Sequence, residues 1–216
     1  MSTPTVADTR RRTAETDEPP APFAVRRLGW VLVVGGALGL AAAFALTVEK
    51  IILVGDPTYV PTCSINPLIS CGSVMVTPQA EVFGFPNPLL GIVGFSVVTT
   101  IGVVQLSGAR LPAWMWWGMQ AGTVFGVGFV HWLFFQSVYR IGALCPYCMV
   151  VWVVTIAIFW YVTLFNLQQG HLKTSPRLRP VVSGLVSYHT VGLLVWLLIL
   201  TGLIGVRFWS YWQTLL

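Results

Sequence analysis

The stretch IGALCPYCMVVWVVTIAIFWYVTLFNLQQ, residues 141–169, carries no charged side chain and is long enough to cross a membrane as a helix. A spanning helix needs about 20 mostly apolar residues. Four further segments are equally free of charge and lack the prolines and polar residues of a loop. The five predicted spans are residues 28–48, 88–109, 111–139, 141–169 and 181–206. We therefore predict an all-α protein that crosses the membrane five times.

The composition agrees with a membrane protein. Of the 216 residues, 56% are hydrophobic and only 9% are charged, whereas a soluble domain carries roughly 25% charged residues. The mean hydropathy of +0.78 points the same way. The net charge of +5 comes from basic residues that flank the apolar segments and form no basic stripe interleaved with aromatic residues. We therefore exclude nucleic acid as a partner.

The distribution of basic residues predicts the orientation. Positive charges gather on the cytoplasmic side of membrane proteins. If the N-terminus is cytoplasmic, nine of the twelve Lys and Arg residues lie inside, and only Lys50, Arg140 and Arg207 lie outside. We therefore predict a cytoplasmic N-terminus and an extracytoplasmic C-terminus. Residues 49–87, which are rich in proline and hydroxyl side chains after position 56, become an extracytoplasmic loop.

The remaining segments are predicted from their composition. Residues 1–27 are polar and mixed in charge, which is typical of a disordered cytoplasmic tail. Residues 166–180 form a cytoplasmic linker, and residues 181–216 a fifth spanning helix with a short outer tail. Glu49 and Lys50 are interpreted as the interfacial stop of the first span. Two glycine stripes, at positions 35 and 39 and at positions 118, 122 and 126, are interpreted as surfaces for close helix packing.

The four cysteines fall on one side of the membrane in this topology. Cys63 and Cys71 lie in the first outer loop, and Cys145-Pro146-Tyr147-Cys148 stands at the outer end of the fourth span. A Cys-x-x-Cys pair at a helix N-terminus favours a low thiol pKa and a reducible disulfide. Two alternatives remain open, namely purely structural disulfides and a zinc site. A zinc site would favour two pairs of cysteines that are each closely spaced in sequence. Cys63 and Cys71 are not closely spaced in this sense, so we predict no metal.

Two disulfide-capable pairs on one side of a membrane favour a relay, because thiol–disulfide exchange passes electrons between pairs. A pair on a loop can reach a soluble protein. A pair at the membrane surface can reach a lipid-soluble electron carrier, for which a quinone is the obvious candidate.

Three motifs resemble one known family. They are Cys63-Ser64-Ile65-Asn66-Pro67 continuing to Ser70-Cys71-Gly72-Ser73-Val74, then Phe83-Gly84-Phe85-Pro86-Asn87-Pro88-Leu89-Leu90-Gly91, and Leu144-Cys145-Pro146-Tyr147-Cys148. Together they resemble the vitamin K epoxide reductase family and are most similar to its bacterial members. The resemblance covers residues 28–165 as a four-helix catalytic core. The fifth span is similar to the extra helix of many bacterial members.

The resemblance implies a role for each cysteine. Cys148 would contact a quinone of the menaquinone or ubiquinone type, and Cys145 would exchange with the loop. Cys71 would be the loop sulfur that attacks Cys145. Cys63 would form the mixed disulfide with a thioredoxin-fold partner.

The resemblance also implies a quinone site. Asn87 matches the family's amide that hydrogen-bonds a quinone carbonyl, while Thr77 matches a hydroxyl position and Asp56 an acidic one. Where family members often have a second donor, a tyrosine four residues after the Cys-x-x-Cys motif, this chain has Trp152. An indole N–H can still donate a hydrogen bond.

We expect from this resemblance a thiol:quinone oxidoreductase of the bacterial inner membrane. It would reoxidise a separate DsbA-like protein, since some members carry a fused thioredoxin-like domain after the fifth span and this sequence ends at Leu216. Reduction of vitamin K or its epoxide on the same fold is an alternative. A non-catalytic membrane protein with structural or metal-binding cysteines is another.

Overall fold

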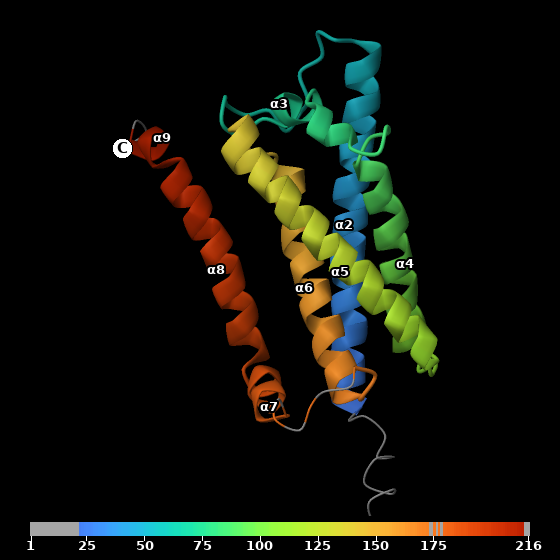
Figure 1. The fold of residues 1–216 in the computed structure, drawn as a ribbon. Helices are drawn as coiled ribbons and strands as arrows, with labels where there is room; N and C mark the ends of the chain where they lie inside the picture. The colour runs from blue at the N-terminus through green and yellow to red at the C-terminus, as the bar shows by residue number, and fades with distance from the viewer. Residues whose placement is uncertain (1–21, 173–174, 176, 178, 214–216) are drawn as a thin grey trace, which may run out of the picture.

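Five long helices form the protein, as the computed structural model shows for residues 22–172, 175, 177 and 179–213. The helices that are long and apolar enough to span a membrane comprise residues Val25–Gly55, Pro88–Leu106, Ala113–Ile141, Pro146–Gln168 and His189–Arg207. No strand occurs among the described residues, which contain a single isolated β-bridge. The predicted all-α membrane fold with five spans is therefore confirmed (Figure 1).

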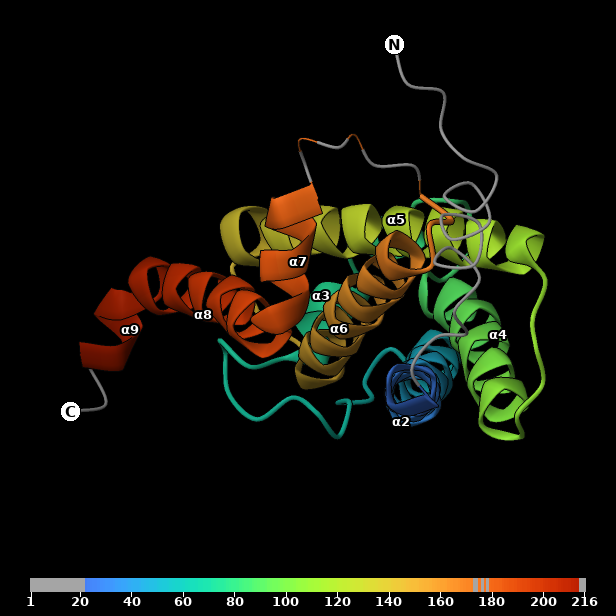
Figure 2. The same ribbon diagram turned by 90° about the horizontal axis from the view of Figure 1, so that it is seen from below.

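Helix α2 (Pro22–Gly55) lies between α4 (Pro88–Leu106) and α6 (Pro146–Gln168), and α5 (Ala113–Phe135) packs on α6 (Figures 1 and 2). Glycines allow α2 to approach its neighbours closely. A Cβ atom on Gly39 would lie 2.5 Å from the Phe95 ring, and one on Gly35 would lie 3.3 Å from Ile158. The prediction that Gly35 and Gly39 serve close packing is confirmed.

The second glycine stripe behaves differently. A Cβ atom on Gly118 or Gly122 would meet nothing within 4 Å, and only Gly126 approaches a neighbour, the Thr155 side chain. The interpretation of Gly118 and Gly122 as packing residues was wrong. A helix face without side chains either allows another helix to pack closely or leaves space beside the helix. Here Gly118 and Gly122 line a cavity.

Two helix boundaries on α2 differ from the prediction. The helix begins at Pro22, six residues before the predicted start, so the predicted disordered tail is helical from there on; residues 1–21 lie outside the described residues. The helix also continues past Glu49 and Lys50 to Gly55. Charged residues mark the edge of the apolar segment, but a helix satisfies its own backbone hydrogen bonds and need not end there.

The later helices also have different ends. Helix α6 begins at Pro146 and not at position 141, because α5 runs on into a π-helical turn, η2 (Gln136–Ile141), which ends at Gly142 in the left-handed region with φ 75°. The predicted fifth span is divided at Tyr188 into α7 (Arg179–Ser187) and α8 (His189–Arg207), and a short α9 (Trp209–Gln213) follows.

The loop between α2 and α4 lies across one end of the bundle (Figure 1). It contains the short helix α3 (Cys71–Met75) and a 3₁₀ turn, η1 (Pro78–Glu81). Ser70 caps α3, since its side chain accepts a hydrogen bond from the Ser73 backbone N–H. The loop therefore presents Cys71 at the first position of a helix, above the end of α6.

Candidate redox site

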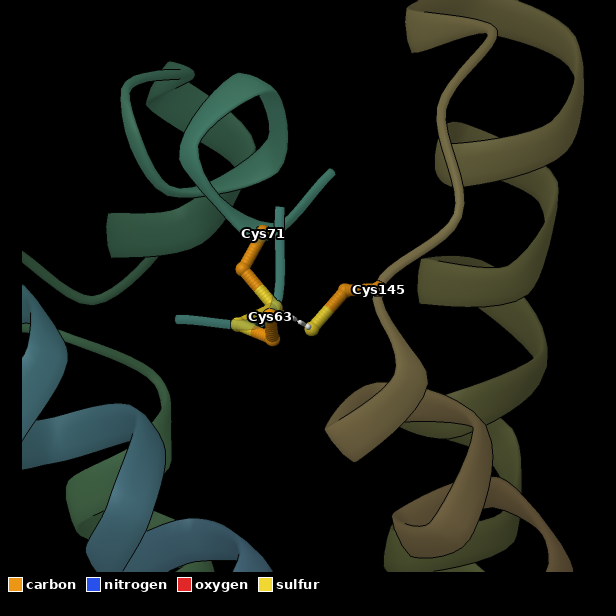
Figure 3. A group of neighbouring side chains, drawn as sticks. All are labelled: Cys63, Cys71 and Cys145. Atoms are coloured by element: carbon orange, nitrogen blue, oxygen red, sulfur yellow. Dashed lines mark hydrogen bonds between the residues drawn. A yellow bond between two sulfur atoms is a disulfide. The ribbon is translucent and has the colours of Figure 1, made fainter. Parts of the chain in front are cut away.

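The loop cysteines and the helix cysteines meet at one end of the bundle. Cys63 and Cys71 form a disulfide, and Cys145 and Cys148 are free thiols. The Cys145 Sγ atom lies 3.1 Å from the Cys71 Sγ atom (Figure 3). Cys63, Cys71 and Cys145 are all buried, with their sulfurs within 4.8 Å of one another. The two predicted pairs are thus in contact for exchange.

A backbone bridge places these sulfurs together. The Ser70 N–H donates to the Leu144 carbonyl at 2.9 Å, and the Leu144 N–H donates to the Leu68 carbonyl at 2.7 Å. Ser70 and Leu144 each precede a cysteine directly. The bridge therefore brings Cys71 beside Cys145, although they are 74 residues apart in sequence.

Side chains near both segments of the bridge form hydrogen bonds that stabilise its conformation. The Asn66 Oδ1 atom accepts hydrogen bonds from the backbone N–H groups of Leu68 (3.0 Å) and Ile69 (2.6 Å), which folds the loop into an Asx turn. On the opposite side, the Ser137 hydroxyl donates to the Ala143 carbonyl. Both segments of the bridge are therefore also held by local hydrogen bonds.

Cys145 is the N-cap residue of α6. A hydrogen bond from the Cys148 side chain lowers the pKa of the Cys145 thiol, and the backbone N–H groups of Cys148 and Tyr147 lower it further, while burial opposes them. The net effect is a pKa below the usual value. This is the expected behaviour of a thiol at the free N–H groups of a helix start.

Removing the Cys148 side chain is expected to raise the pKa of Cys145. The test uses a chain in which Cys63 and Cys71 are both alanine, reduced and titrated by the ultraviolet absorbance of the thiolate. The first thiolate is expected to form at a lower pH than that of an ordinary cysteine. Adding Cys148→Ala removes the largest stabilising hydrogen bond, so the midpoint moves to higher pH. An unchanged midpoint would contradict this origin of the shift.

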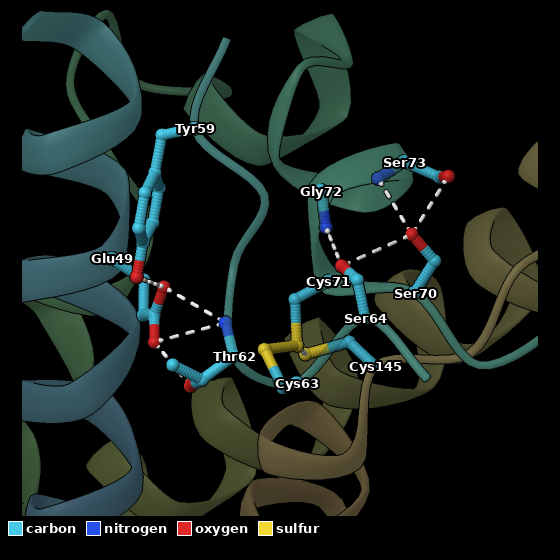
Figure 4. Close-up of a disulfide and its surroundings, with 10 residues drawn as sticks. All are labelled: Glu49, Tyr59, Thr62, Cys63, Ser64, Ser70, Cys71, Gly72, Ser73 and Cys145. Atoms are coloured by element: carbon cyan, nitrogen blue, oxygen red, sulfur yellow. Dashed lines mark hydrogen bonds between the residues drawn. A yellow bond between two sulfur atoms is a disulfide. The ribbon is translucent and has the colours of Figure 1, made fainter. Parts of the chain in front are cut away.

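Glu49 anchors the segment that carries Cys63. Its carboxylate, only 7% exposed, accepts hydrogen bonds from the Tyr59 hydroxyl (2.9 Å) and from the hydroxyl and backbone N–H of Thr62, the residue before Cys63 (Figure 4). The carboxylate also raises the pKa of Tyr59 through this hydrogen bond. The sequence interpretation of Glu49 as an interfacial stop missed this contact, which a helix continuing beyond the apolar segment makes possible.

A cavity of about 560 Å³ lies on the membrane side of the cysteines. Cys145 and Cys148 line one end, and apolar residues of α2, α4, α5 and α6 line most of the rest. It extends to Trp114 and Met115 at the far end of α5 and passes Gly118 and Gly122. This volume is in the range of sites for small ligands, and the apolar lining suits a lipid-soluble one.

Asn87 and Trp152 both line this cavity. The Asn87 Nδ2 atom donates to the Gln79 carbonyl at 2.7 Å, and its Oδ1 accepts from the Val82 N–H at 3.2 Å. One N–H of the amide is left over, because an amide nitrogen carries two. Trp152 is buried against Phe134, with ring centroids 5.2 Å apart.

The two other predicted residues differ in position. Thr77 lines the cavity, but its hydroxyl donates to the Val74 carbonyl at 2.7 Å. Asp56 is not among the lining residues and sits in an exposed turn after α2, where it accepts hydrogen bonds from the Thr58 hydroxyl (2.6 Å) and N–H (2.9 Å). These bonds lower the pKa of Asp56. The sequence Asp56-Pro57-Thr58 is itself typical of such a turn.

Lys50 is a further residue of the cavity that the sequence did not reveal. Its ammonium group lies 2.7 Å from the Glu81 carboxylate and donates to the Met75 carbonyl at 2.8 Å. These contacts tie the extension of α2 to both α3 and η1 in the loop between α2 and α4. The ion pair is partly exposed, so its contribution to stability is modest, but it fixes one wall of the cavity.

A family model described as the vitamin K epoxide reductase family matches residues 30–163, more than half of the chain. The chain belongs to this family. A search of curated proteins found no match. The matched region contains all four cysteines and the cavity residues Asn87 and Trp152, whereas α7 and α8 lie beyond it. Membership makes the chain a membrane oxidoreductase of a family that acts on thiols and on quinones or vitamin K.

The family's chemistry also fits the cysteine cluster better than metal binding does. A soft metal ion would need several thiolates, and three cysteine sulfurs are close enough to supply them. The Cys63–Cys71 disulfide, however, uses two of the three, which leaves Cys145 as the single free thiol of this group. In this redox state the cluster is arranged for exchange.

Proposed function

We propose that the chain is a thiol:quinone oxidoreductase that reoxidises a separate DsbA-like thioredoxin-fold protein outside the cytoplasm. The observation that carries the proposal is the 3.1 Å contact between Cys71 and Cys145, with the apolar cavity on the far side of Cys148. A bacterial inner membrane and the predicted orientation, with the N-terminus in the cytoplasm, belong to the same proposal.

The first step takes place at the loop pair. A thiolate of the reduced partner attacks the Cys63 sulfur, which forms a mixed disulfide and releases the Cys71 thiolate. The partner's second thiol then displaces Cys63, so the partner leaves oxidised and the loop is reduced. Cys63 is only 7% exposed in this state, so the segment around Thr62 must open, and the hydrogen bonds to Glu49 are contacts that such an opening breaks.

The second step passes the electrons to the helix pair. The Cys71 thiolate attacks the Cys145 sulfur of a Cys145–Cys148 disulfide and releases Cys148. Cys63 then attacks Cys71 and releases Cys145. The products are a closed Cys63–Cys71 disulfide and free Cys145 and Cys148 thiols, which is the arrangement in the structure.

The third step takes place at the cavity. A bound quinone of the menaquinone or ubiquinone type supplies a two-electron, two-proton acceptor. Cys145 and Cys148 give up two electrons and two protons and close their disulfide again. The free N–H of Asn87 and the indole N–H of Trp152 are the donors we assign to the quinone carbonyls. The direction requires a quinone more oxidising than the partner, and in a two-electron couple 30 mV corresponds to about 1.4 kcal/mol.

The proposal is tested by turnover in detergent. The purified chain is given a reduced DsbA-like protein or a small dithiol, and quinone absorbance is followed over time. We expect quinone loss with both donors and recovery of oxidised partner in equal amount. Vitamin K epoxide in place of quinone tests the alternative substrate. If the folded protein reduces neither acceptor with either donor, the proposal is wrong and the cysteines are structural.

Gly122→Leu is expected to weaken binding of quinones with long isoprenoid tails. Gly122 lines the cavity, and a Cβ atom there would meet no protein atom within 4 Å, so a larger side chain at this position extends into cavity space. We expect KM for a long-tailed quinone to rise about tenfold, equivalent to about 1.4 kcal/mol. A short-tailed quinone should be reduced with nearly unchanged KM.

Gly128→Leu is the matched control. Gly128 lies on the same helix, also meets nothing within 4 Å, and is not among the cavity residues. Both changes raise helix propensity equally. If the two variants have the same KM for the long-tailed quinone, the tail does not run past Gly122.

A further inference from the structure

Helix α8 lies apart from the α2, α4 and α6 core along much of its length (Figures 1 and 2), and no residue of α8 itself is buried. One of its faces nevertheless touches the rest of the protein. This face follows positions four apart, at Gly192, Trp196, Leu200, Ile204 and, directly after the helix, Phe208. Residues at this spacing form a single ridge along a helix.

The first half of this ridge is fixed by directional contacts. The Trp160 indole N–H donates to the His189 carbonyl at 2.9 Å, and a Cβ atom on Gly192 would lie 2.7 Å from the Trp160 ring. Further along, the His131 Nδ1–H donates to the Val127 carbonyl, so its Nε2 accepts from the Trp196 indole N–H at 3.1 Å. These hydrogen bonds set the register of α8 against α5 and α6.

The second half ends at the backbone bridge of the redox site. The helix breaks at Phe208, whose ring is 7% exposed although Trp209 beside it is 60% exposed. Phe208 belongs to the same buried apolar cluster as Leu68 and Leu144, two of the three residues whose backbone groups form the hydrogen bonds of the bridge. The cluster also includes Trp152, and Leu200, Ile204 and Tyr211 pack against it. The fifth helix thus ends in the apolar cluster that contains two residues of the bridge.

We infer that Phe208 is a positioning residue for thiol exchange, which supports the backbone bridge between residues 68–70 and Leu144 and so keeps Cys71 against Cys145. The bridge consists of two backbone hydrogen bonds, and burial of a large aromatic ring beside it supplies stabilisation that two such bonds lack. The inference rests on the proposed function for its relevance to turnover. It assigns a role to a helix that lies outside the matched family region.

The test uses an intramolecular reaction that needs neither partner nor quinone. In a Cys148→Ala background, three cysteines share one disulfide, and the two pairings compared are Cys63–Cys71 and Cys71–Cys145. At equilibrium in a thiol buffer, alkylation of the free cysteine and peptide mapping give the ratio of the two. Phe208→Ala is expected to lower the Cys71–Cys145 fraction relative to Cys63–Cys71 by about tenfold, a part of the cost of removing a buried ring.

Two further variants make the result specific. Leu198→Ala removes a side chain that is 66% exposed on the opposite face of α8, and the ratio should not change. Phe208→Leu keeps an apolar side chain and should restore most of the ratio. Thermal unfolding of each variant separates a change in the ratio from loss of the fold.

The outcomes are distinguishable from those of the proposed function. If folded Phe208→Ala has the wild-type ratio, the inference is overturned, whatever the enzyme turns over. If the ratio shifts as expected while the wild type reduces no quinone, the proposed function fails and the support of the bridge by Phe208 stands. If Leu198→Ala shifts the ratio equally, the effect belongs to general loosening of α8, and the inference also fails.

Discussion

Replacing Cys148 by serine is expected to abolish quinone reduction with every thiol donor. Cys148 and Cys145 are the cysteines that line the cavity, and a hydroxyl cannot form the disulfide that releases two electrons. Cys145→Ser should be equally severe, because Cys145 is both the partner of Cys148 and the sulfur that lies 3.1 Å from Cys71. We expect the rate to fall by about a thousandfold or more, as for loss of a nucleophile.

The measurement is quinone absorbance with a protein donor and with a small dithiol. Met149→Leu is the matched control, since it conserves volume next to Cys148 at a position that is not among the cavity residues. It should keep near wild-type rates. Substantial quinone reduction by folded Cys148→Ser with either donor would mean that electrons leave the protein by another route.

The sequence predicted the spans and the meeting of the cysteines for physical reasons. A bilayer imposes a minimum apolar length, so charge-free segments identify spanning helices almost independently of their packing. Two predicted spans lie between the loop with Cys63 and Cys71 and the start of α6 with Cys145. An even number of crossings places both cysteine pairs on the same side of the membrane. Membership of the family confirms the motif reading, whereas the individual roles of the cysteines stay predictions.

The contacts that depend on tertiary structure were not predictable in this way. Gly118 and Gly122 have the same spacing as Gly35 and Gly39, yet one pair borders a cavity and the other pair packs. Glu49 follows an apolar segment as a stop signal does, but only the fold of the loop brings Tyr59 and Thr62 to it. The spacing of residues in the sequence shows which side chains share a helix face. It does not show what that face contacts in the folded protein.

The same limit applies to the fifth helix. Residues 191–206 are apolar on nearly all sides of the helix, so their periodicity does not distinguish a face toward lipid from a face toward protein. The ridge from Gly192 to Phe208 becomes visible only through its contacts with Trp160, His131 and the bridge cluster. Only these contacts show that Phe208, beyond the matched family region, lies in the apolar cluster that contains two residues of the bridge.

Cys63→Ala is expected to separate the two kinds of thiol donor. A small dithiol can reduce the Cys145–Cys148 disulfide without the loop, so quinone reduction with that donor should stay within a fewfold of the wild type. A protein donor is too large to enter the buried cluster and depends on attack at Cys63. With that donor we expect the rate to fall by about a hundredfold or more, since a different pathway has to carry the exchange.

Thr58→Val provides the control for a change in the loop between α2 and α4, because its side chain is exposed and its hydroxyl bonds the Asp56 carboxylate. It should leave both donors effective. A DsbA-like partner without its second active-site cysteine should form a mixed disulfide with the wild type that maps to Cys63, and none with Cys63→Ala. Equal loss with both donors would contradict the division of labour between the pairs. A mixed disulfide mapped to Cys71 would reverse the roles of the loop cysteines, because Cys71 would then face the partner while Cys63 had to reach Cys145.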